Sequence, residues 1–259
     1  MNRPFTLVTW NINGVRARLD DVLAYLSERS PDIACLQEIK CEDKLFPRVP
    51  FMELGYDVQV HGAKGYAGVC TLSKVAPTEV IRGFREGPAD QHSRILDVLV
   101  DGTRVYNLYV PNGTAFGSEA FAYKLEWLAR LRAELDAHCS PQQPVILCGD
   151  FNIAPDERDV VDPRALEGCT HFSPAEHAAL KQLLAFGLRD CFREHDERPG
   201  QFTWWDYRRG DFEKNRGMRI DHVYATAPLL DRSESVLHDT TPRTWEQPSD
   251  HIPVVARFR

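Results

Sequence analysis

The sequence predicts a protein of the α/β or α+β class, because two hydrophobic patterns alternate along the chain and polar residues follow several apolar runs. Leu19, Val22 and Leu26, for example, recur at helical spacing. The run from Ile95 to Val100 is short and apolar, as a buried strand is. Side chains that could carry chemistry stand where such runs end.

The predicted elements can be placed in chain order. They are strand 5–10, helix 19–26, strands 33–36, 56–61, 95–100 and 104–110, helix 121–135, strand 145–147, helix 180–184, and strands 219–223 and 254–256. The helical leucine stripes are expected to face the core. The loop from His61 to Gly68 resembles a phosphate-binding loop, but no Gly-Lys-Ser/Thr opens a helix there. A hairpin turn is therefore the better prediction.

The whole chain, residues 1–259, is expected to form a single domain and a monomer. With 259 residues and 43% hydrophobic content it can bury a large core. No Pro-, Gly- or Ser-rich linker, low-complexity tract or repeat divides it.

Targeting signals are not visible in this sequence. The first residues lead directly into a strand, and no apolar stretch is long enough to span a bilayer. Seven scattered cysteines form no Cys-x-x-Cys pair or Cys/His cluster with zinc spacing, so reduced thiols are expected. We therefore expect a soluble, cytoplasmic protein with no membrane partner.

The most informative segment is Cys148-Gly149-Asp150-Phe151-Asn152, which follows the apolar run 145–147. On an extended segment, Asp150 and Asn152 would leave the same face. A carboxylate and an amide oxygen presented together suit a hard divalent cation. Taken alone, Gly-Asp-x-Asn after a strand is also a common turn that satisfies its own backbone.

Similar polar residues stand at the ends of other apolar runs. Five of them are of types that bind metals or move protons: Asn11, Glu38, Asp221, Asp250 and His251. Such residues gathered at strand ends are expected when the rim of a buried sheet carries a metal site.

The charge distribution bears on a nucleic-acid partner. The formal net charge is −7, whereas proteins held to DNA mainly by phosphate contacts are usually basic. Between Tyr207 and Arg219, however, five basic residues face only two acidic ones, and this segment follows Trp204 and Trp205. Aromatic and basic residues together suit stacking on nucleotides and contact with phosphates. The alternative is a solvated loop with one core tryptophan.

Six segments together resemble the ordered motifs of the exonuclease III family, which consists of abasic-site endonucleases and 3′-exonucleases among the DNase I-like phosphohydrolases. They are residues 10–18, 36–40, 149–155, 202–208, 217–222 and 248–251. The resemblance covers nearly the whole chain. It implies an α/β four-layer sandwich in which two mixed β-sheets pack face to face between outer helices.

The same resemblance implies a DNA phosphodiesterase of base excision repair that depends on Mg²⁺ or Mn²⁺ and cuts the backbone 5′ to abasic sites, processes 3′ ends as a 3′-5′ exonuclease or 3′-phosphatase, or does both. The substrate would be double-stranded DNA with abasic sites, nicks or recessed 3′ ends. The residues implied at the metal site are Asn11, Glu38, Asp150, Asn152, Asp250 and His251. Asp150 would be the general base and Asn152 would hold the water or the phosphate. His251, oriented by Asp221, and Tyr109 would contact the phosphate.

Expected DNA contacts are Tyr66, Arg94, Trp204, Arg216 and His171. His171 stands where many relatives carry a small residue. Two interpretations stay open: a surface histidine before a helix, or one that projects into the groove, crowds a flipped-out abasic sugar and favours 3′-end processing. Three alternatives stay open: a member restricted to 3′ ends with weak abasic-site cleavage, a related hydrolase of RNA or other phosphoesters, and a catalytically inactive binding protein.

Overall fold

The computed structural model describes residues 3–65, 67–88, 92–166 and 168–259. Two six-stranded sheets and one two-stranded sheet carry its strands. The helices are α1 (Leu19–Arg29), α2 (Arg48–Glu53), α3 (Glu119–His138), α4 (Pro174–Leu184) and α5 (Ala227–Leu230), with 3-10 turns η1 (Asp43–Leu45), η2 (Glu157–Asp159) and η3 (Thr241–Thr244).

The first sheet has the strand order β13-β14-β1-β2-β4-β3. Its strands are β1 (Phe5–Asn11), β2 (Ile33–Gln37), β3 (Asp57–His61), β4 (Val69–Ser73), β13 (Ser233–His238) and β14 (Val254–Phe258). β1 runs parallel to β2 and antiparallel to β14. The end of β1, the end of β2 and the start of β14 therefore meet at one edge.

The second sheet has the order β5-β6-β7-β8-β12-β9. Its strands are β5 (Glu79–Arg82), β6 (Ile95–Val100), β7 (Thr103–Tyr109), β8 (Val145–Asp150), β9 (Leu188–Asp190) and β12 (Asp221–Thr226). β7 is parallel to β8, and β12 is antiparallel to it, with Asp221 opposite Asp150. The two-stranded sheet pairs β10 (Trp204–Trp205) with β11 (Gly217–Met218).

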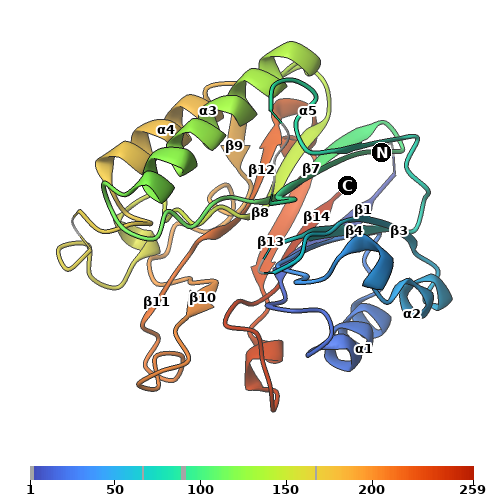
Figure 1. Cartoon of the computed structure of the whole chain (residues 1–259), viewed down its shortest axis with the longest axis horizontal. Coiled ribbons are helices and arrows are strands. Elements are labelled where there is room, and N and C mark those ends of the chain that lie inside the picture. Colours follow the sequence, from blue (N-terminus) through green and yellow to red (C-terminus); the bar gives the residue numbers. More distant parts are fainter. Residues whose placement is uncertain (1–2, 66, 89–91, 167) are drawn as a thin grey trace.

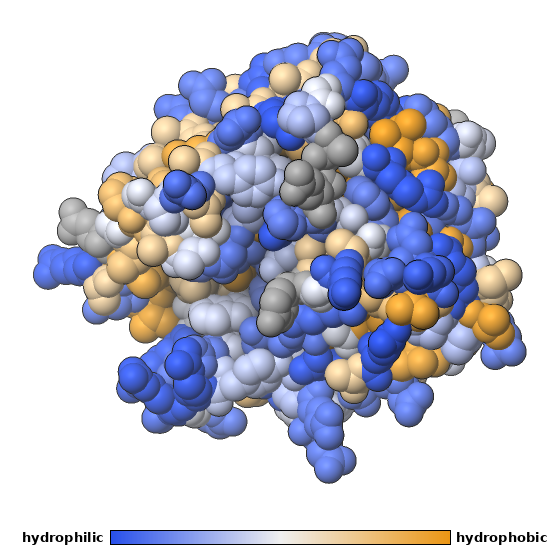
Figure 2. Space-filling view, viewed as in Figure 1, coloured by the Kyte–Doolittle hydropathy of each residue, from blue (hydrophilic) through white to orange (hydrophobic). Residues whose placement is uncertain are grey.

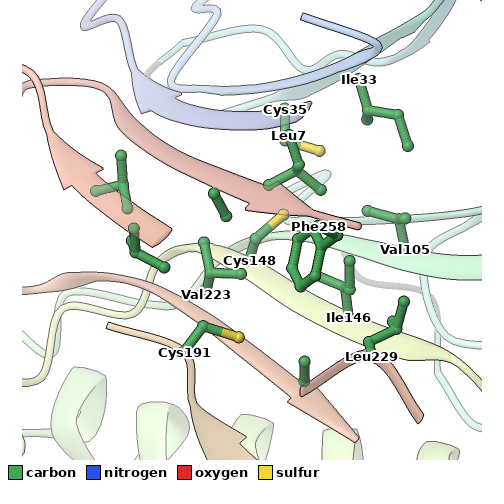
Figure 3. Packing of buried hydrophobic residues seen from close by; sticks show 14 of the residues in the cluster. Leu7, Ile33, Cys35, Val105, Ile146, Cys148, Cys191, Val223, Leu229 and Phe258 are labelled. Atoms are coloured by element: carbon green, nitrogen blue, oxygen red, sulfur yellow. The ribbon is translucent and has the colours of Figure 1, made fainter. Parts of the chain in front are cut away.

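The sheets pack face to face, with helices outside them (Figure 1). Leu7, Cys35, Val105 and Cys148 meet between the sheets (Figure 3). A second cluster lies between the first sheet and α1 and α2, and a third between the second sheet and α3 and α4. The predicted four-layer α/β sandwich is confirmed.

The hydrophobic patterns located the elements closely. The three leucine-rich segments form α1, α3 and α4, and the run 95–100 forms β6. The hairpin prediction is also confirmed, because β3 and β4 pair antiparallel with His61 opposite Val69. Within the ranges given above, no helix combines the length and apolarity needed to cross a bilayer.

Candidate active site

The polar residues that follow the apolar runs meet at one edge of the two sheets. Asn11 ends β1 and Glu38 follows β2 in the first sheet. Tyr109 ends β7, Asp150 ends β8 and Asp221 begins β12 in the second. A pocket of about 190 Å³ opens there. It is lined by Glu38, Tyr109, Asn112, Asp150, Asn152, His171, Trp204, Met218, Ile220, Asp250 and His251.

The carboxylates of Glu38 and Asp150 line this pocket and are bound by one asparagine. The amide nitrogen of Asn11 donates to Glu38 Oε1 over 2.9 Å and to Asp150 Oδ2 over 3.0 Å. Its amide oxygen accepts the backbone N–H of Asn13. In this orientation Asn11 holds the two carboxylates together, and its oxygen faces the backbone.

The segment after β8 differs from the extended geometry that the sequence suggested. β8 ends at Asp150, and Asn152 has a left-handed backbone with φ of 52°. The backbone N–H of Asn152 donates to Asp150 Oδ1 over 2.8 Å. The segment is therefore a turn, and yet both side chains line the pocket. Gly149 is needed because a Cβ there would lie 1.9 Å from the carbonyl oxygen of Leu108.

His251 is held by a buried carboxylate. Its Nδ1 lies 2.9 Å from Asp221 Oδ2, and its Nε2 lies 3.8 Å from Asp150 Oδ2. Thr203 Oγ1 donates to Asp221 Oδ2 over 2.6 Å. Burial disfavours the imidazolium, but Asp221 and Asp150 outweigh this and raise the pKa of His251 to about 10. The imidazole is therefore cationic, with its Nε2–H directed toward the pocket.

Two acidic groups in the pocket, Asp150 and Tyr109, have raised pKa values. Burial, reinforced by Asp221 and Glu38, raises the pKa of Asp150 to about 7, although His251 opposes this. Burial, together with Glu38 and Asp150, also raises the pKa of Tyr109, so its hydroxyl stays protonated. The Arg94 guanidinium lies 4.6 Å from the Tyr109 ring centroid.

The opposite wall consists of Asn152, Asn112 and His171. The amide nitrogen of Asn112 lies 3.1 Å from Asn152 Oδ1 and 3.4 Å from His171 Nε2. His171 Nδ1 lies 2.7 Å from the carbonyl oxygen of Asn152, which can only accept. Nδ1 therefore carries the proton and Nε2 accepts from Asn112. Burial and the charge of Lys124 lower the pKa of His171 to about 4, which keeps the ring neutral.

Asp250 lies beside the carboxylate pair and is bound on both oxygens. Asn13 donates to Oδ1 over 2.9 Å, and the Trp204 indole donates to Oδ2 over 3.0 Å. Burial opposes ionisation, but His251 and these donors lower the pKa of Asp250 below its usual value. Trp204 thus connects the β10–β11 segment to the pocket.

Three residues that line the pocket have a strained backbone. Glu38, Asn152 and His171 have φ of 48°, 52° and 77°, in the left-handed region that non-glycine residues seldom occupy. Such conformations persist where the surroundings over-determine them, as at functional sites.

Two further residues predicted as DNA contacts, Arg94 and Arg216, do not line the pocket. Arg216 is exposed on the loop between β10 and β11. Arg94 binds the backbone of Tyr109, because its Nη1 donates to the Tyr109 carbonyl oxygen. Tyr66 lies outside the described residues. The roles predicted for these residues as DNA contacts stay predictions.

Three side chains that sequence reasoning did not assign also shape the site: Asn13, Asn112 and Thr203. Asn13 and Asn112 follow strand ends, as the predicted residues do, so the same signal could have found them. Thr203 lies inside a predicted motif, but nothing in the sequence marks it as the partner of Asp221.

The pocket fits a divalent metal ion. Glu38, Asp150 and His251 each offer a ligand atom, and these atoms lie within 4.8 Å of one another. Because His251 is cationic in this arrangement, the carboxylates are the better ligands. Oxygen donors of this kind suit a hard cation.

Two packed sheets whose shared edge carries paired carboxylates and an Asp-supported histidine define a phosphohydrolase of the DNase I-like class. The chain belongs to the endonuclease/exonuclease/phosphatase family, whose model matches residues 8–251. It is 36% identical to exodeoxyribonuclease III of Haemophilus influenzae, over 97% of this chain and 99% of that protein. The predicted relation to exonuclease III is confirmed.

Two solved structures are also similar. The first is an AP endonuclease from Archaeoglobus fulgidus, with a TM-score of 0.92 and 36% identity over 98% of this chain and 99% of that one. The second is the 3′ phosphatase NExo from Neisseria bound to product DNA hairpin, with a TM-score of 0.95 and 35% identity over the same shares.

Proposed function

We propose that this protein is a Mg²⁺- or Mn²⁺-dependent DNA phosphodiesterase of base excision repair that acts chiefly on 3′ ends. The observation that carries the proposal is the placement of His171 in one pocket with Glu38, Asp150 and His251. His171 bears on the choice of substrate, whereas the other three residues carry the chemistry.

Each polar group has a role that its surroundings support. The pKa of Asp150 is about 7 in the metal-free pocket, and a bound cation would lower it, so the carboxylate is ionised at neutral pH and can take a proton from water. The cationic His251 and the protonated Tyr109 are donors for the phosphate oxygens. Asp221 keeps the Nδ1 proton of His251 in place, so that Nε2–H is available to the phosphate.

Glu38 and Asp150 would hold the cation, and Asp250 would act near it, directly or through water. A bound Mg²⁺ or Mn²⁺ would supply positive charge to the phosphate and lower the pKa of water. Asn11 and Asn152 were predicted as further ligands. In the arrangement described above, Asn11 serves better to orient the carboxylates. The amide nitrogen of Asn152 donates one N–H to the carbonyl of Val110 over 3.0 Å and has a second N–H for the phosphate.

DNA is the substrate that the relatives support, since the Neisseria phosphatase is bound to a DNA hairpin. On this chain, Arg208, Arg209, Lys214 and Arg216 are exposed on the loop between β10 and β11. The loop projects from the body of the molecule (Figure 1), and its surface is hydrophilic (Figure 2). Its cations would contact phosphates flanking the site, while Trp204 lines the pocket itself.

His171 supports the preference for 3′ ends. An internal abasic sugar must leave the helix and enter a pocket, whereas a frayed 3′ end arrives without full extrusion. The imidazole occupies one wall, fixed by Asn152 and Asn112. It would therefore penalise the abasic sugar more than the 3′ end.

A side-by-side assay tests the proposal. The purified protein, with Mg²⁺, is given an abasic duplex, a duplex with a 3′-phosphate nick and one with a recessed 3′ end. We expect turnover of the two 3′-end substrates to exceed that of the abasic duplex. Faster cleavage of the abasic duplex would reject the preference. Activity on matched RNA or on soluble phosphomonoesters alone would favour the related-phosphoesterase alternative.

A further inference from the structure

Beneath the pocket wall lies a fully buried ion pair that the chemistry proposed above does not use. Lys124, on α3, and Glu176, on α4, both have no exposed side-chain surface. Lys124 Nζ lies 2.5 Å from Glu176 Oε1. The remaining question is what this pair does.

The lysine also binds two pocket loops. Its Nζ donates to the carbonyl oxygen of Asn152 over 2.7 Å and to that of Asn112 over 3.2 Å. With Glu176, these are three acceptors for the three N–H groups of one ammonium. Lys124 thus joins the loop after β7 to the loop after β8.

The carboxylate binds the third loop. Glu176 Oε1 accepts the backbone N–H of His171 over 2.9 Å, and Oε2 accepts the N–H and hydroxyl of Ser173. The carbonyl of Asn152 accepts from both Lys124 and His171 Nδ1. All three residues of the pocket wall are therefore connected to one ion pair.

Stability alone does not account for such a pair. Removing two charges from water is costly, and well-packed apolar residues of similar size often replace a buried ion pair without loss of stability. The best-attested benefit of buried charges is the selection of one arrangement among several. Here the selected arrangement includes the left-handed backbone of Asn152 and His171.

We propose that Lys124 and Glu176 are positioning residues that hold Asn112, Asn152 and His171 in the geometry needed for turnover. The pair contacts neither the substrate nor the cation. It acts through the backbone carbonyls of Asn112 and Asn152 and the backbone N–H of His171. The effect on turnover rests on the proposed function, whereas the effect on loop order does not.

The test is the double variant Lys124→Met/Glu176→Gln, which removes both charges and leaves neither one buried alone. We expect kcat on the 3′-phosphate nick to fall between about tenfold and a hundredfold, as misplaced catalytic groups do, with KM within about twofold. Hydrogen exchange of peptides covering residues 110–114, 150–154 and 170–173 should become faster. Exchange in β1 and β2 should not change.

A matched control lies on the same helix. Glu134 of α3 pairs with Arg85, away from the pocket. Arg85→Met/Glu134→Gln should leave kcat and the exchange of the three loops unchanged. If the Lys124 double variant does not fold, Lys124→Gln/Glu176→Gln gives the same comparison, because both amides can still bind the loops and neither charge is left buried alone.

A folded Lys124 variant with wild-type kcat and unchanged loop exchange would overturn the proposal. Equal loss of kcat in the Arg85/Glu134 control would also overturn it, since the effect would then be general. If the wild-type protein is inactive on every DNA substrate, the proposed function fails. The exchange measurement would still decide whether the pair orders the three loops.

Discussion

Asp221 Oδ2 lies 2.9 Å from His251 Nδ1, and this contact decides what His251 can do. The carboxylate accepts the Nδ1 proton and favours the cationic ring, so the other N–H points to the pocket, 3.8 Å from Asp150. A base and a proton donor thus lie side by side at the pocket, 3.8 Å apart, where both can reach a phosphate and the water that attacks it.

Replacing the proposed base should abolish most turnover without preventing DNA binding. For Asp150→Asn we expect kcat to fall by at least about a hundredfold, because the amide can neither take a proton nor neutralise the cation. His251→Asn should lose a similar amount through weaker phosphate stabilisation. The double variant should lose less than the product of the two effects, because the residues act as a unit.

Stability measurements separate these losses from unfolding. Burial raises the pKa of Asp150 to about 7, so the charged carboxylate is disfavoured in the metal-free protein. Asp150→Asn should therefore not lower the free energy of unfolding in EDTA at pH 8. Near-normal turnover in either single variant would contradict the assigned roles.

Metal removal should abolish activity. Because the carboxylates of Glu38 and Asp150 are oxygen donors, EDTA should stop turnover and Mg²⁺ or Mn²⁺ should restore it without zinc. Glu38→Gln should raise the Mg²⁺ concentration needed for half-maximal rate. Full activity in a metal-stripped preparation would rule out this mechanism.

Replacing His171 by serine should change the substrate preference. The ratio of abasic-site cleavage to 3′-phosphate removal should rise at least about tenfold. This is the lower end of the change in substrate discrimination that a small steric difference in a pocket produces. His177→Ser is the matched control, because His177 on α4 is bound to the carbonyl of Ala154 and does not line the pocket. An unchanged ratio for His171→Ser would show that specificity is set elsewhere, for instance in the loop 204–219.

Mild acid should destabilise the protein through His222. Burial, with Arg219 adding to it, lowers the pKa of His222 to about 4. Arg219 donates to Nδ1, and Nε2 donates to the carbonyl of Ile153, so only the neutral ring fits. As the pH falls below about 6.5, the unfolded chain binds the proton first. Stability should therefore fall between about pH 6.5 and 4.

The variant His222→Gln checks this, since an amide can accept from Arg219 and donate to Ile153. The difference in unfolding free energy between pH 7.5 and 5 should shrink by on the order of 2 kcal/mol relative to wild type. Exposed His195 supplies the control His195→Gln. An unchanged difference for His222→Gln would contradict the prediction.

The fold class, the positions of most elements and the polar residues at the sheet edge can be predicted from the amino-acid sequence alone. Hydrophobic patterns locate helices and strands because the buried side chains recur every three or four residues in a helix and every second residue in a strand. Asp150, Glu38 and His251 are visible because polar residues that follow buried strands lie at a sheet edge. Their meeting was predictable once the family motifs were recognised.

Tertiary structure alone decided which way these groups face. Asn152 was expected on an extended segment, yet it lies in a left-handed turn because Asp150, Asn112 and Lys124 bind it from three sides. Lys124 lies in a helix where its neighbours give no hint of a buried ammonium. Orientation depends on hydrogen bonds between residues far apart in the chain, and local pattern does not contain that information.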